Sequence, residues 1–435
     1  MSYLFYNIKK HNYIRFSSKF PETREWSFCE ICVFLWLNFK FLIVSIVKYR
    51  GRLRNSFIAK PLSKVVVLSL TENQKKTTDP ICRHLDAEQV SVISDNINEY
   101  VSRECVNIYS ALYIINFAMT YLFSAKKQKK IIRQNVKEFY NTIGTIRVAE
   151  FLLRQNYVKL LVVANDHSMF YRAFIIAAKK YGIDTMYLQH ASVTYRFPPL
   201  QFSYAFLDGE DALQKYRSAG NIEGDVYLCG SPRFDILKKY RSRVEGVILG
   251  VTINLFDNES KIRDMLLFLK ERGYTNIIVR PHPRKNIDFD WYLNRKFCIS
   301  NSKSELSFEF LSKISLLISG ESGIHLDSAL VGVKSICYNF SDYKDIEDWY
   351  SYHKNGLYPM VNDFESLLCE IQKNSVEEIS KEKIVYYNAA YGLPIEGHVG
   401  EMLADFIQMF ICGNLSDFDK KYCFEKGIDE IKRYR

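Results

Sequence analysis

Residues 275–285 read TNIIVRPHPRK, and this stretch indicates the fold class of the chain. Its first part, Ile277 to Val279, is a short run of β-branched apolar residues, which predicts a buried strand. The run ends at Arg280, and His282 and Arg284 follow, separated by two prolines that restrict the backbone. Buried strands that end in polar residues are typical of open α/β sheets, which bind ligands at the carboxyl ends of their strands.

The same alternation of apolar runs and helical segments continues on both sides of this stretch. Apolar runs that end in polar or small residues occur at 65–70, 158–166, 184–191, 202–211 and 225–235, and, after a basic, polar break at 238–246, at 246–254, 276–283, 315–323 and 334–340. Gly182 and Gly273 close two of the intervening helical patterns as C-terminal caps. We therefore expect an α/β protein with two doubly wound units joined near residue 240.

Length and composition narrow the function classes. A chain of 435 residues with 48% apolar residues is globular and long enough for two domains. The net charge of +10 favours an anionic partner such as a nucleotide, an acidic glycan or a phospholipid surface, and no nucleic-acid-binding module accompanies it. The ten cysteines are scattered and form no zinc pattern, which favours a reducing cytoplasm, and Cys298 and Cys337 are expected in the core.

An apolar stretch near the N-terminus, residues 29–47, carries Asn38 and Lys40 at its centre, which makes a membrane-spanning helix costly. Its flank at 48–54 is basic. Two interpretations stay open: a helix packed in the domain, or a helix that lies in the membrane interface beside its basic flank. No cleavable signal peptide is expected at the N-terminus.

The second unit contains the residues best suited to bind an anion. Arginine side chains present planar donors to phosphate oxygens, and a histidine can donate to a phosphoryl oxygen or protonate a leaving phosphate. The glycine- and serine-rich turn at 319–323 opens an expected helix, whose N-terminal N–H groups bind phosphate well. It matches neither a P-loop nor a dinucleotide fingerprint. The predicted donor-binding residues are Arg280, His282, Arg284, Ser319, Gly320, Glu321, Ser322 and Gly323.

The first unit supplies candidates for a catalytic base. His190 and Asp166 each follow an apolar run, so each side chain is expected at the edge of the first sheet that faces the second unit. With His282, they are the predicted catalytic residues. The acidic cluster at 208–211 is expected to cap a helix. No metal-binding pair follows a strand, so neither a metal nor a cofactor is expected.

A series of motifs in one order resembles a known family. These are VVAND, YLQHA, LDGED, LCGSPRFD, IIVRPHPR, SLLISGESGIHLDSALVGVKSICYN and YYNAAYGLPIEG, spread over residues 158 to 400. They resemble the GT-B glycosyltransferases of bacterial surface polysaccharide assembly. Within these enzymes the closest likeness is to the group that uses CMP- or CDP-activated donors: capsular Kdo transferases, bacterial sialyl- and polysialyltransferases, and CDP-glycerol glycerophosphotransferases.

The resemblance implies a GT-B fold, with two Rossmann-like domains that face each other across a cleft. It also implies that His282, Ser319 and Ser322 bind the donor phosphate and that His190 is the base. The expected domains are a helical N-terminal segment at 1–60, an acceptor domain at 61–240, a donor domain at 241–380, and helices at 381–435 that return to the first domain.

The implied activity is transfer of a sugar or polyol phosphate from a nucleotide-activated donor to a glycan or lipid-linked acceptor. The expected location is the cytoplasm, with residues 29–54 favoured for contact with the inner face of the bacterial membrane. Two alternatives stay open: a nucleotide-sugar 2-epimerase of the same architecture, which requires catalytic carboxylates in the first domain, and a non-catalytic subunit of a polysaccharide assembly complex.

Overall fold

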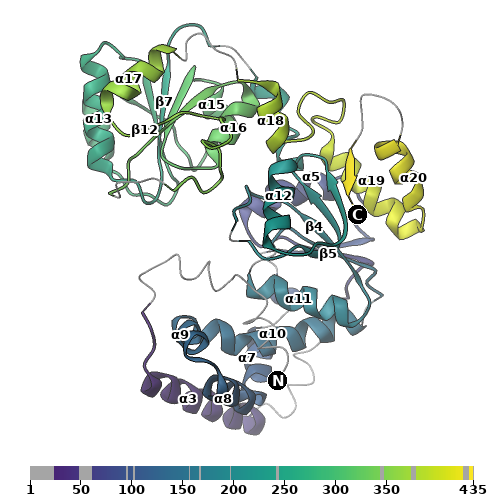
Figure 1. Ribbon diagram of the computed structural model, residues 1–435. Coiled ribbons are helices and arrows are strands. Elements are labelled where there is room, and N and C mark those ends of the chain that lie inside the picture. Colours follow the sequence, from purple (N-terminus) through teal and green to yellow (C-terminus); the bar gives the residue numbers. More distant parts are fainter. Residues whose placement is uncertain are drawn as a thin grey trace.

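The computed structural model describes residues 24–48, 61–94, 97–100, 103–155, 157–165, 168–195, 197–241, 244–342, 347–373, 379–424 and 431–434. Within these ranges the chain builds two sheets of parallel strands that lie in two lobes (Figure 1). We call the lobe that contains residues 249–361 the donor lobe and the lobe that contains residues 65–228 the acceptor lobe, after the roles that the sequence predicts for them. The α/β class and the doubly wound arrangement predicted from the sequence are confirmed.

The sheet of the acceptor lobe has, among the described residues, the order β13-β6-β5-β4-β3-β1-β2. Its strands are β1 (Val65–Leu68), β2 (Val90–Ile93), β3 (Leu160–Val163), β4 (Asp184–Leu188), β5 (Gln201–Leu207), β6 (Glu223–Leu228) and β13 (Lys432–Tyr434). All neighbours pair in parallel except β13, which runs antiparallel to β6. The central strands β1 and β3 read VVVL and LLVV and are buried throughout, as expected of parallel strands covered on both faces.

The sheet of the donor lobe has the order β12-β11-β10-β7-β8-β9 and is parallel throughout its described strands. These strands are β7 (Leu249–Ile253), β8 (Ile277–Pro281), β9 (Cys298–Ile299), β10 (Leu316–Ser319), β11 (Lys334–Tyr338) and β12 (Met360–Val361). Residues 275–285 contain β8 and the turn after it. Cys337 lies in the core as predicted, whereas the prediction for Cys298 is wrong, because short β9 forms the sheet edge and leaves that thiol exposed.

Helices cover both sheets and form a separate layer below the acceptor sheet (Figure 1). They are α3 (Phe28–Lys48), α5 (Glu72–Cys82), α6 (Ile97–Tyr100), α7 (Arg103–Leu112), α8 (Ile114–Phe123), α9 (Lys126–Gln134), α10 (Val136–Gln155), α11 (Met169–Lys180), α12 (Glu210–Ala219), α13 (Glu259–Glu271), α14 (Phe289–Asn294), α15 (Ser307–Leu311), α16 (Ile324–Val331), α17 (Phe364–Lys373), α18 (Lys381–Tyr387), α19 (Val399–Cys412) and α20 (Leu415–Asp419). Gly182 and Gly273 take positive φ angles of 65° and 90° just after α11 and α13, so both predicted C-terminal caps are confirmed.

The chain returns from the donor lobe to the acceptor lobe through α18 and α19. Helix α19 packs Leu403 and Phe406 into the core of the acceptor sheet. Asp235 holds its first turn, because the carboxylate accepts from Val399 N at 3.0 Å and Gly400 N at 2.8 Å. The returning segment lies close to Gly230, where a Cβ would be only 2.7 Å from Ala390 Cβ. The φ of Gly230, +75°, also favours glycine at this position.

Both sheets contain a point at which the strand order reverses. In the donor lobe this point lies between β7 and β10, and in the acceptor lobe it lies between β1 and β3. Loops leave neighbouring strands in opposite directions there and leave a crevice at the carboxyl ends, which is where open α/β sheets bind ligands. The predicted base Asp166 follows β3 at one such point, but it lies outside the described residues.

Candidate active site

The loops after β7 and β10 meet at the strand-order reversal of the donor lobe. A Cβ added to Gly320 would lie 2.7 Å from Asp257 Oδ1 and 3.2 Å from Asn254 Nδ2, so only glycine allows this approach. Asp257 in turn accepts from Asn254 N at 2.7 Å. The Asn254 amide nitrogen is buried and has no hydrogen-bond partner among the residues that the structure describes. That orphaned donor makes Asn254 a candidate ligand contact that the sequence analysis missed.

Helix α16 begins at the same crevice. Its N-cap is Gly323, and an added Cβ there would meet no described atom within 4 Å apart from its chain neighbours. Ser322 makes a long contact from its Oγ to Ile324 N at 3.5 Å. The space beside Gly323 therefore leaves room for a ligand at the N-terminus of α16, where the helix dipole favours an anion such as a phosphate.

His282 follows β8 beside the end of β7, because its N–H donates to Ile253 O at 2.8 Å. The Nδ1 atom of its ring accepts from Arg284 N at 3.1 Å. Since Nδ1 is then unprotonated, the ring proton of the neutral form lies on Nε2. Partial burial, and secondarily the charge of Arg284, lower the pKa of His282 below its ordinary value. The ring is consequently a neutral hydrogen-bond donor at physiological pH.

Two predicted donor contacts have side chains engaged within the donor lobe. The buried guanidinium of Arg280 donates to Ser300 Oγ at 2.6 Å and to Glu305 O at 2.8 Å, and it pairs with the Glu305 carboxylate at 3.4 Å. Ser319 is fully buried, and its Oγ accepts from Thr252 at 2.5 Å. These side-chain bonds hold β8 and β10 in place. A contact from Arg280 or Ser319 to a ligand would therefore have to come from their backbone atoms. Arg284, by contrast, is exposed.

The residues suggest two roles for Glu321, a cap of the helix N–H groups or a contact to a sugar hydroxyl, and its carboxylate makes no bond to the described N–H groups of α16. Its carboxylate accepts from the Tyr358 hydroxyl and from Tyr350 N, the latter at 3.3 Å. Burial raises the pKa of this carboxyl to about 7. Glu321 thus ties the turn after β10 to the segment between β11 and β12.

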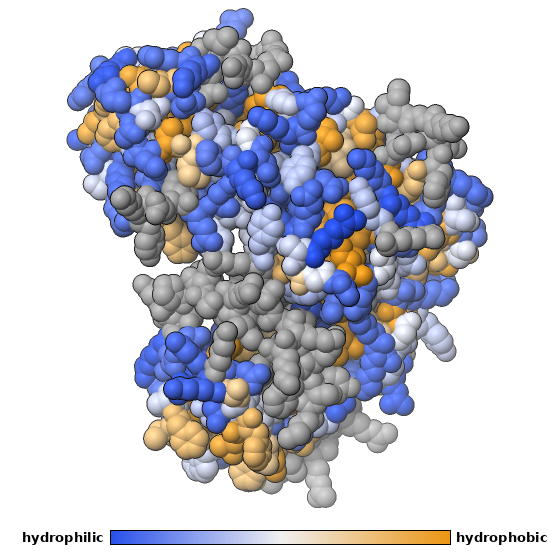
Figure 2. Space-filling view, viewed as in Figure 1, coloured by the Kyte–Doolittle hydropathy of each residue, from blue (hydrophilic) through white to orange (hydrophobic). Residues whose placement is uncertain are grey.

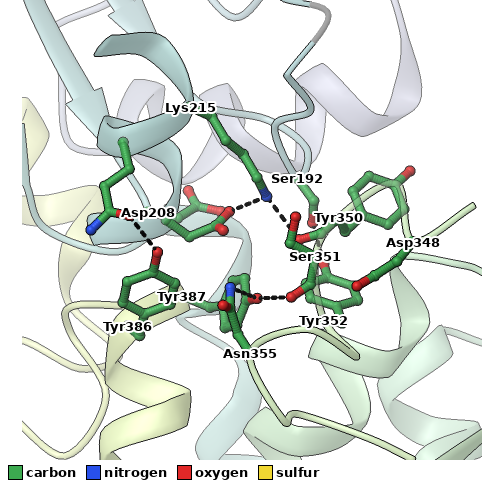
Figure 3. Close-up of polar contacts among 12 residues, drawn as sticks. Ser192, Asp208, Lys215, Asp348, Tyr350, Ser351, Tyr352, Asn355, Tyr386 and Tyr387 are labelled. Atoms are coloured by element: carbon green, nitrogen blue, oxygen red, sulfur yellow. Dashed lines mark hydrogen bonds and ion pairs between the residues drawn. The ribbon is translucent and has the colours of Figure 1, made fainter. Parts of the chain in front are cut away.

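That same segment joins the two lobes (Figure 3). Lys215 of α12 donates to Tyr350 O at 2.8 Å and to Asp211 Oδ2 at 2.6 Å, and Ser192 shares a hydrogen bond of 2.6 Å with the Tyr352 hydroxyl. Lys215 is 1% exposed, so the ion pair is withdrawn from solvent. A buried, partnered cation at the lobe boundary fixes how the two carboxyl edges face each other.

The acceptor lobe places His190 after β4 and Asp208 after β5 at the edge that faces the donor lobe. The prediction that the 208–211 cluster caps a helix is wrong: the N-cap is Gly209, Asp211 pairs with Lys215, and Asp208 is fully buried. Burial raises the pKa of Asp208 to about 7, against the opposing influence of Arg233 at 3.3 Å.

Arg233 sits between carboxylates of both lobes. It pairs with Asp208 of the acceptor lobe, and its charge also acts on Asp327 of α16 in the donor lobe. The Asp208 Oδ1 atom is buried with no hydrogen-bond partner in the described part of the chain. Sequence reasoning could have found Asp208, because it follows the strand QFSYAFL just as His190 follows DTMYL.

The described residues contain no group of three or more His, Cys, Asp or Glu side chains arranged to hold a metal ion. The donors that converge on the crevice are instead a histidine N–H, an amide and a helix N-terminus. Donors of these kinds bind anions such as phosphate.

Comparisons with known proteins identify the fold. No protein-family model and no curated protein sequence matches the chain. Among solved structures, a UDP-N-acetylglucosamine 2-epimerase superposes with a TM-score of 0.50 at 10% identity, covering 81% of this chain and 97% of the other. The corresponding enzyme of Neisseria meningitidis, bound to UDP-GlcNAc, gives 0.50 at 13% identity and covers 79% and 99%. The wall teichoic acid polymerase TagF gives 0.49 at 14% identity and covers 88% and 99%. The chain has the GT-B fold, as the resemblance implied.

Proposed function

We propose that this chain is a metal-independent glycosyltransferase of bacterial surface polysaccharide assembly. It moves a sugar or polyol phosphate from a nucleotide-activated donor, CMP- or CDP-linked, to a glycan or lipid-linked acceptor, and it works in the cytoplasm. The observation that supports this proposal most is the convergence of three kinds of anion-binding donor at the β7–β10 reversal point: Asn254 Nδ2, the N-terminus of α16 and His282 Nε2.

Breaking the bond between sugar and phosphate leaves negative charge on the departing nucleotide. Fixed N–H donors stabilise that charge without reorganising, which is the largest contribution in many enzymes. His282 supplies one such donor as a neutral ring, and Ser322 and Gly323 present the helix N-terminus. The nucleotide base and ribose would then lie along the turn that Glu321 fixes.

The acceptor hydroxyl needs a base on the opposite lobe. We assign this role to Asp208, with His190 and Asp166 as the other candidates. Asp208 suits it because its buried carboxylate carries an unpartnered Oδ1 within the described residues and a pKa near 7. Arg233 holds the other oxygen and orients the group.

Two glycine variants test the phosphate site. Gly320→Ala is expected to lower nucleotide affinity by about tenfold and also to destabilise the protein, because its Cβ would displace Asp257 and Asn254. The methyl group of Gly323→Ala meets no described atom within 4 Å, so the variant is expected to keep the melting temperature, yet to weaken nucleotide binding because the methyl group meets the phosphate. Calorimetric titration measures the nucleotide affinity of each variant, and thermal unfolding measures its stability. If both variants keep full affinity, the nucleotide does not bind in this crevice.

The pH dependence of transfer tests the base. An Asp208 base is active when deprotonated, so the rate is expected to fall as pH drops through about 7, the pKa of this carboxyl. Asp208→Asn is expected to lower the single-turnover rate by about 10²–10⁴-fold and to leave nucleotide affinity unchanged. His190→Ala and Asp166→Asn, measured in parallel, decide among the three. If the transfer rate of Asp208→Asn still falls at low pH as the wild-type rate does, the base is another residue.

One observation favours a second candidate, a nucleotide-sugar 2-epimerase. The two structures described above with a TM-score of 0.50 are UDP-GlcNAc 2-epimerases, and the acceptor lobe contains the buried carboxylates Asp208 and Asp211, the kind of group that abstracts a proton from a sugar carbon. Incubation of nucleotide-sugars in D₂O without an acceptor distinguishes the two reactions. An epimerase incorporates deuterium at C2, whereas a transferase leaves C2 unlabelled and releases nucleotide only when an acceptor is added.

A further inference from the structure

Exposed apolar side chains gather on one helical surface below the acceptor sheet. Thirteen of the twenty-two large hydrophobic residues that are exposed in the described chain lie on α3 or at the corner of α7 and α8. They are Phe28, Val33, Trp36, Leu37, Phe39, Phe41, Ile43 and Val44 on α3, with Leu112, Ile115, Met119, Leu122 and Phe123 at the corner. We call these thirteen residues the helical foot. Figure 2 shows orange side chains at the lower end of the molecule, where Figure 1 places α3 and α8.

The foot is the outer face of helices that are otherwise well packed. On α8 the exposed residues recur at helical spacing, whereas Phe117 and Tyr121 on the opposite side are buried. Helix α3 buries Ile31 in the same cluster, beside Tyr140 of α10. The exposed residues of the helical foot are therefore not required for the packing of these helices. An exposed apolar patch of this size marks an interaction surface.

The surroundings of the foot are basic. The sequence from 105 to 137 contains no aspartate or glutamate, and it carries six lysines and arginines. Among these, Lys126 begins α9 three residues after Phe123 and is exposed. The single acidic residue of α3, Glu30, is paired with Arg24 at 2.5 Å. An apolar surface with a cationic border complements an anionic bilayer, whose acyl boundary and headgroups match these two parts.

Two details favour a helix that lies in the interface over one that spans. No single described helix is long and apolar enough to cross a membrane, although 105–112 and 114–123 pass that test as a pair bent by 58°. Lys40, at the middle of α3, is exposed with its Nζ 5.6 Å from the centre of the Trp36 ring. Its long chain can reach the headgroups while the ring enters the acyl boundary.

A groove of about 360 Å³ opens beside the foot. Its polar lining comes from Asn38, Asn107, Asn141 and Lys137, and apolar residues of α3 complete it. An ammonium and three amides next to an apolar surface can seat the polar headgroup of a lipid whose chains lie against the foot.

We propose that the helical foot docks the protein onto an anionic phospholipid bilayer without spanning it, with α8 contributing as much as α3. The sequence suggested membrane contact only for residues 29–54, so the share of α8 is new. The inference does not depend on the proposed reaction, because it uses no residue of the crevice between β7 and β10 and none of the candidate bases.

Flotation with vesicles tests the foot. Wild-type protein is expected to float with vesicles of equal parts phosphatidylglycerol and phosphatidylcholine, and to be released from them by high salt. Ile115→Glu with Leu122→Glu, which removes no buried side chain, is expected to lower the partition coefficient by at least about tenfold. Lys126→Glu with Lys130→Glu is expected to lower it by about fivefold per lysine. The matched control is Leu293→Glu with Leu306→Glu, which changes two exposed leucines of the donor lobe and is expected to bind like wild type.

Three outcomes contradict the proposal. If the Ile115→Glu/Leu122→Glu protein floats with vesicles as well as the wild type does, α8 does not contact the bilayer. Equal binding to pure phosphatidylcholine would remove the anionic preference. A wild-type protein that ignores vesicles but forms a dimer by light scattering, broken by the same variant, would assign the foot to a second copy of the chain. Nucleotide titration of each variant reports separately on the crevice between β7 and β10, so a failed membrane proposal leaves the proposed reaction to its own tests.

Discussion

Replacing His282 by alanine is expected to lower the single-turnover rate by about 10²–10³-fold, the usual cost of removing one donor from developing negative charge. The ring is held for this task by Arg284 N on Nδ1, and it is only partly buried, so the substitution leaves the core intact. Nucleotide affinity is expected to fall as well, because the same N–H contacts the phosphate in the ground state. Unchanged affinity and turnover would contradict the assignment.

A matched control for His282 exists in the acceptor lobe, at the start of α19. His398 is exposed at the N-cap of α19 and contacts only Glu401 among the side-chain bonds of the described residues. His398→Ala removes an imidazole of the same size and is expected to bind nucleotide like wild type. Rapid quench with a labelled donor measures the rate, and calorimetry measures the affinity.

The second large effect is expected at the lobe boundary. Lys215→Met leaves Asp211 buried without its counter-charge and removes the bond to Tyr350 O, so the free energy of unfolding is expected to fall by about 3–5 kcal/mol. Urea denaturation measures this change. The double variant Lys215→Met/Asp211→Leu removes both charges and is expected to recover most of the loss.

The effect of Lys215→Met also depends on pH. The pKa of Asp211 is already raised to about 6 by burial, and Lys215 opposes that rise. Without the lysine the folded-state pKa moves higher still. The penalty is then full above the folded-state pKa, shrinks as pH falls below it, and disappears only near the pKa of an unfolded aspartate, about 4. The variant is therefore expected to be closest to wild type in acid. Lys373→Met, which breaks an exposed pair with Glu370 at 3.0 Å, is the control and is expected to change stability by less than about 1 kcal/mol. An equal loss in both variants would contradict the account of the boundary.

The strands, and the residues that follow them at the carboxyl edge of the sheet, could be predicted from the sequence because both depend on local patterns. Apolar runs such as LLVV and LLIS signal buried parallel strands, and whatever follows them lies at the carboxyl edge. This reasoning placed His282, Ser322 and Gly323 at the crevice of the donor lobe. The same rule puts Asn254 and Asp208 at strand ends, but the sequence interpretation gave Asn254 no role and expected the cluster around Asp208 to cap a helix.

The partners of each side chain could not be predicted, because they come from distant segments. Arg280 pairs with Glu305, twenty-five residues away, and Glu321 meets Tyr358, thirty-seven residues away. Nothing local to RPHPR or SGESG indicates these contacts. An arginine at a strand end therefore resembles a phosphate ligand in sequence, and only the tertiary structure shows that its guanidinium is engaged elsewhere.

The central claim is that the crevice between β7 and β10 binds the phosphate of a nucleotide. Calorimetric titration of the wild-type protein with CMP, CDP, UDP and GDP, repeated on Gly323→Ala and His282→Ala, tests it most directly. We predict that one of these nucleotides binds with one-to-one stoichiometry and that both variants weaken it by about tenfold or more. His282→Ala loses a hydrogen bond to a charged group, and the methyl group of Gly323→Ala meets the phosphate. If no nucleotide binds at about 1 mM, the upper end of ordinary substrate affinities, or if the bound nucleotide is indifferent to both variants, the claim is contradicted.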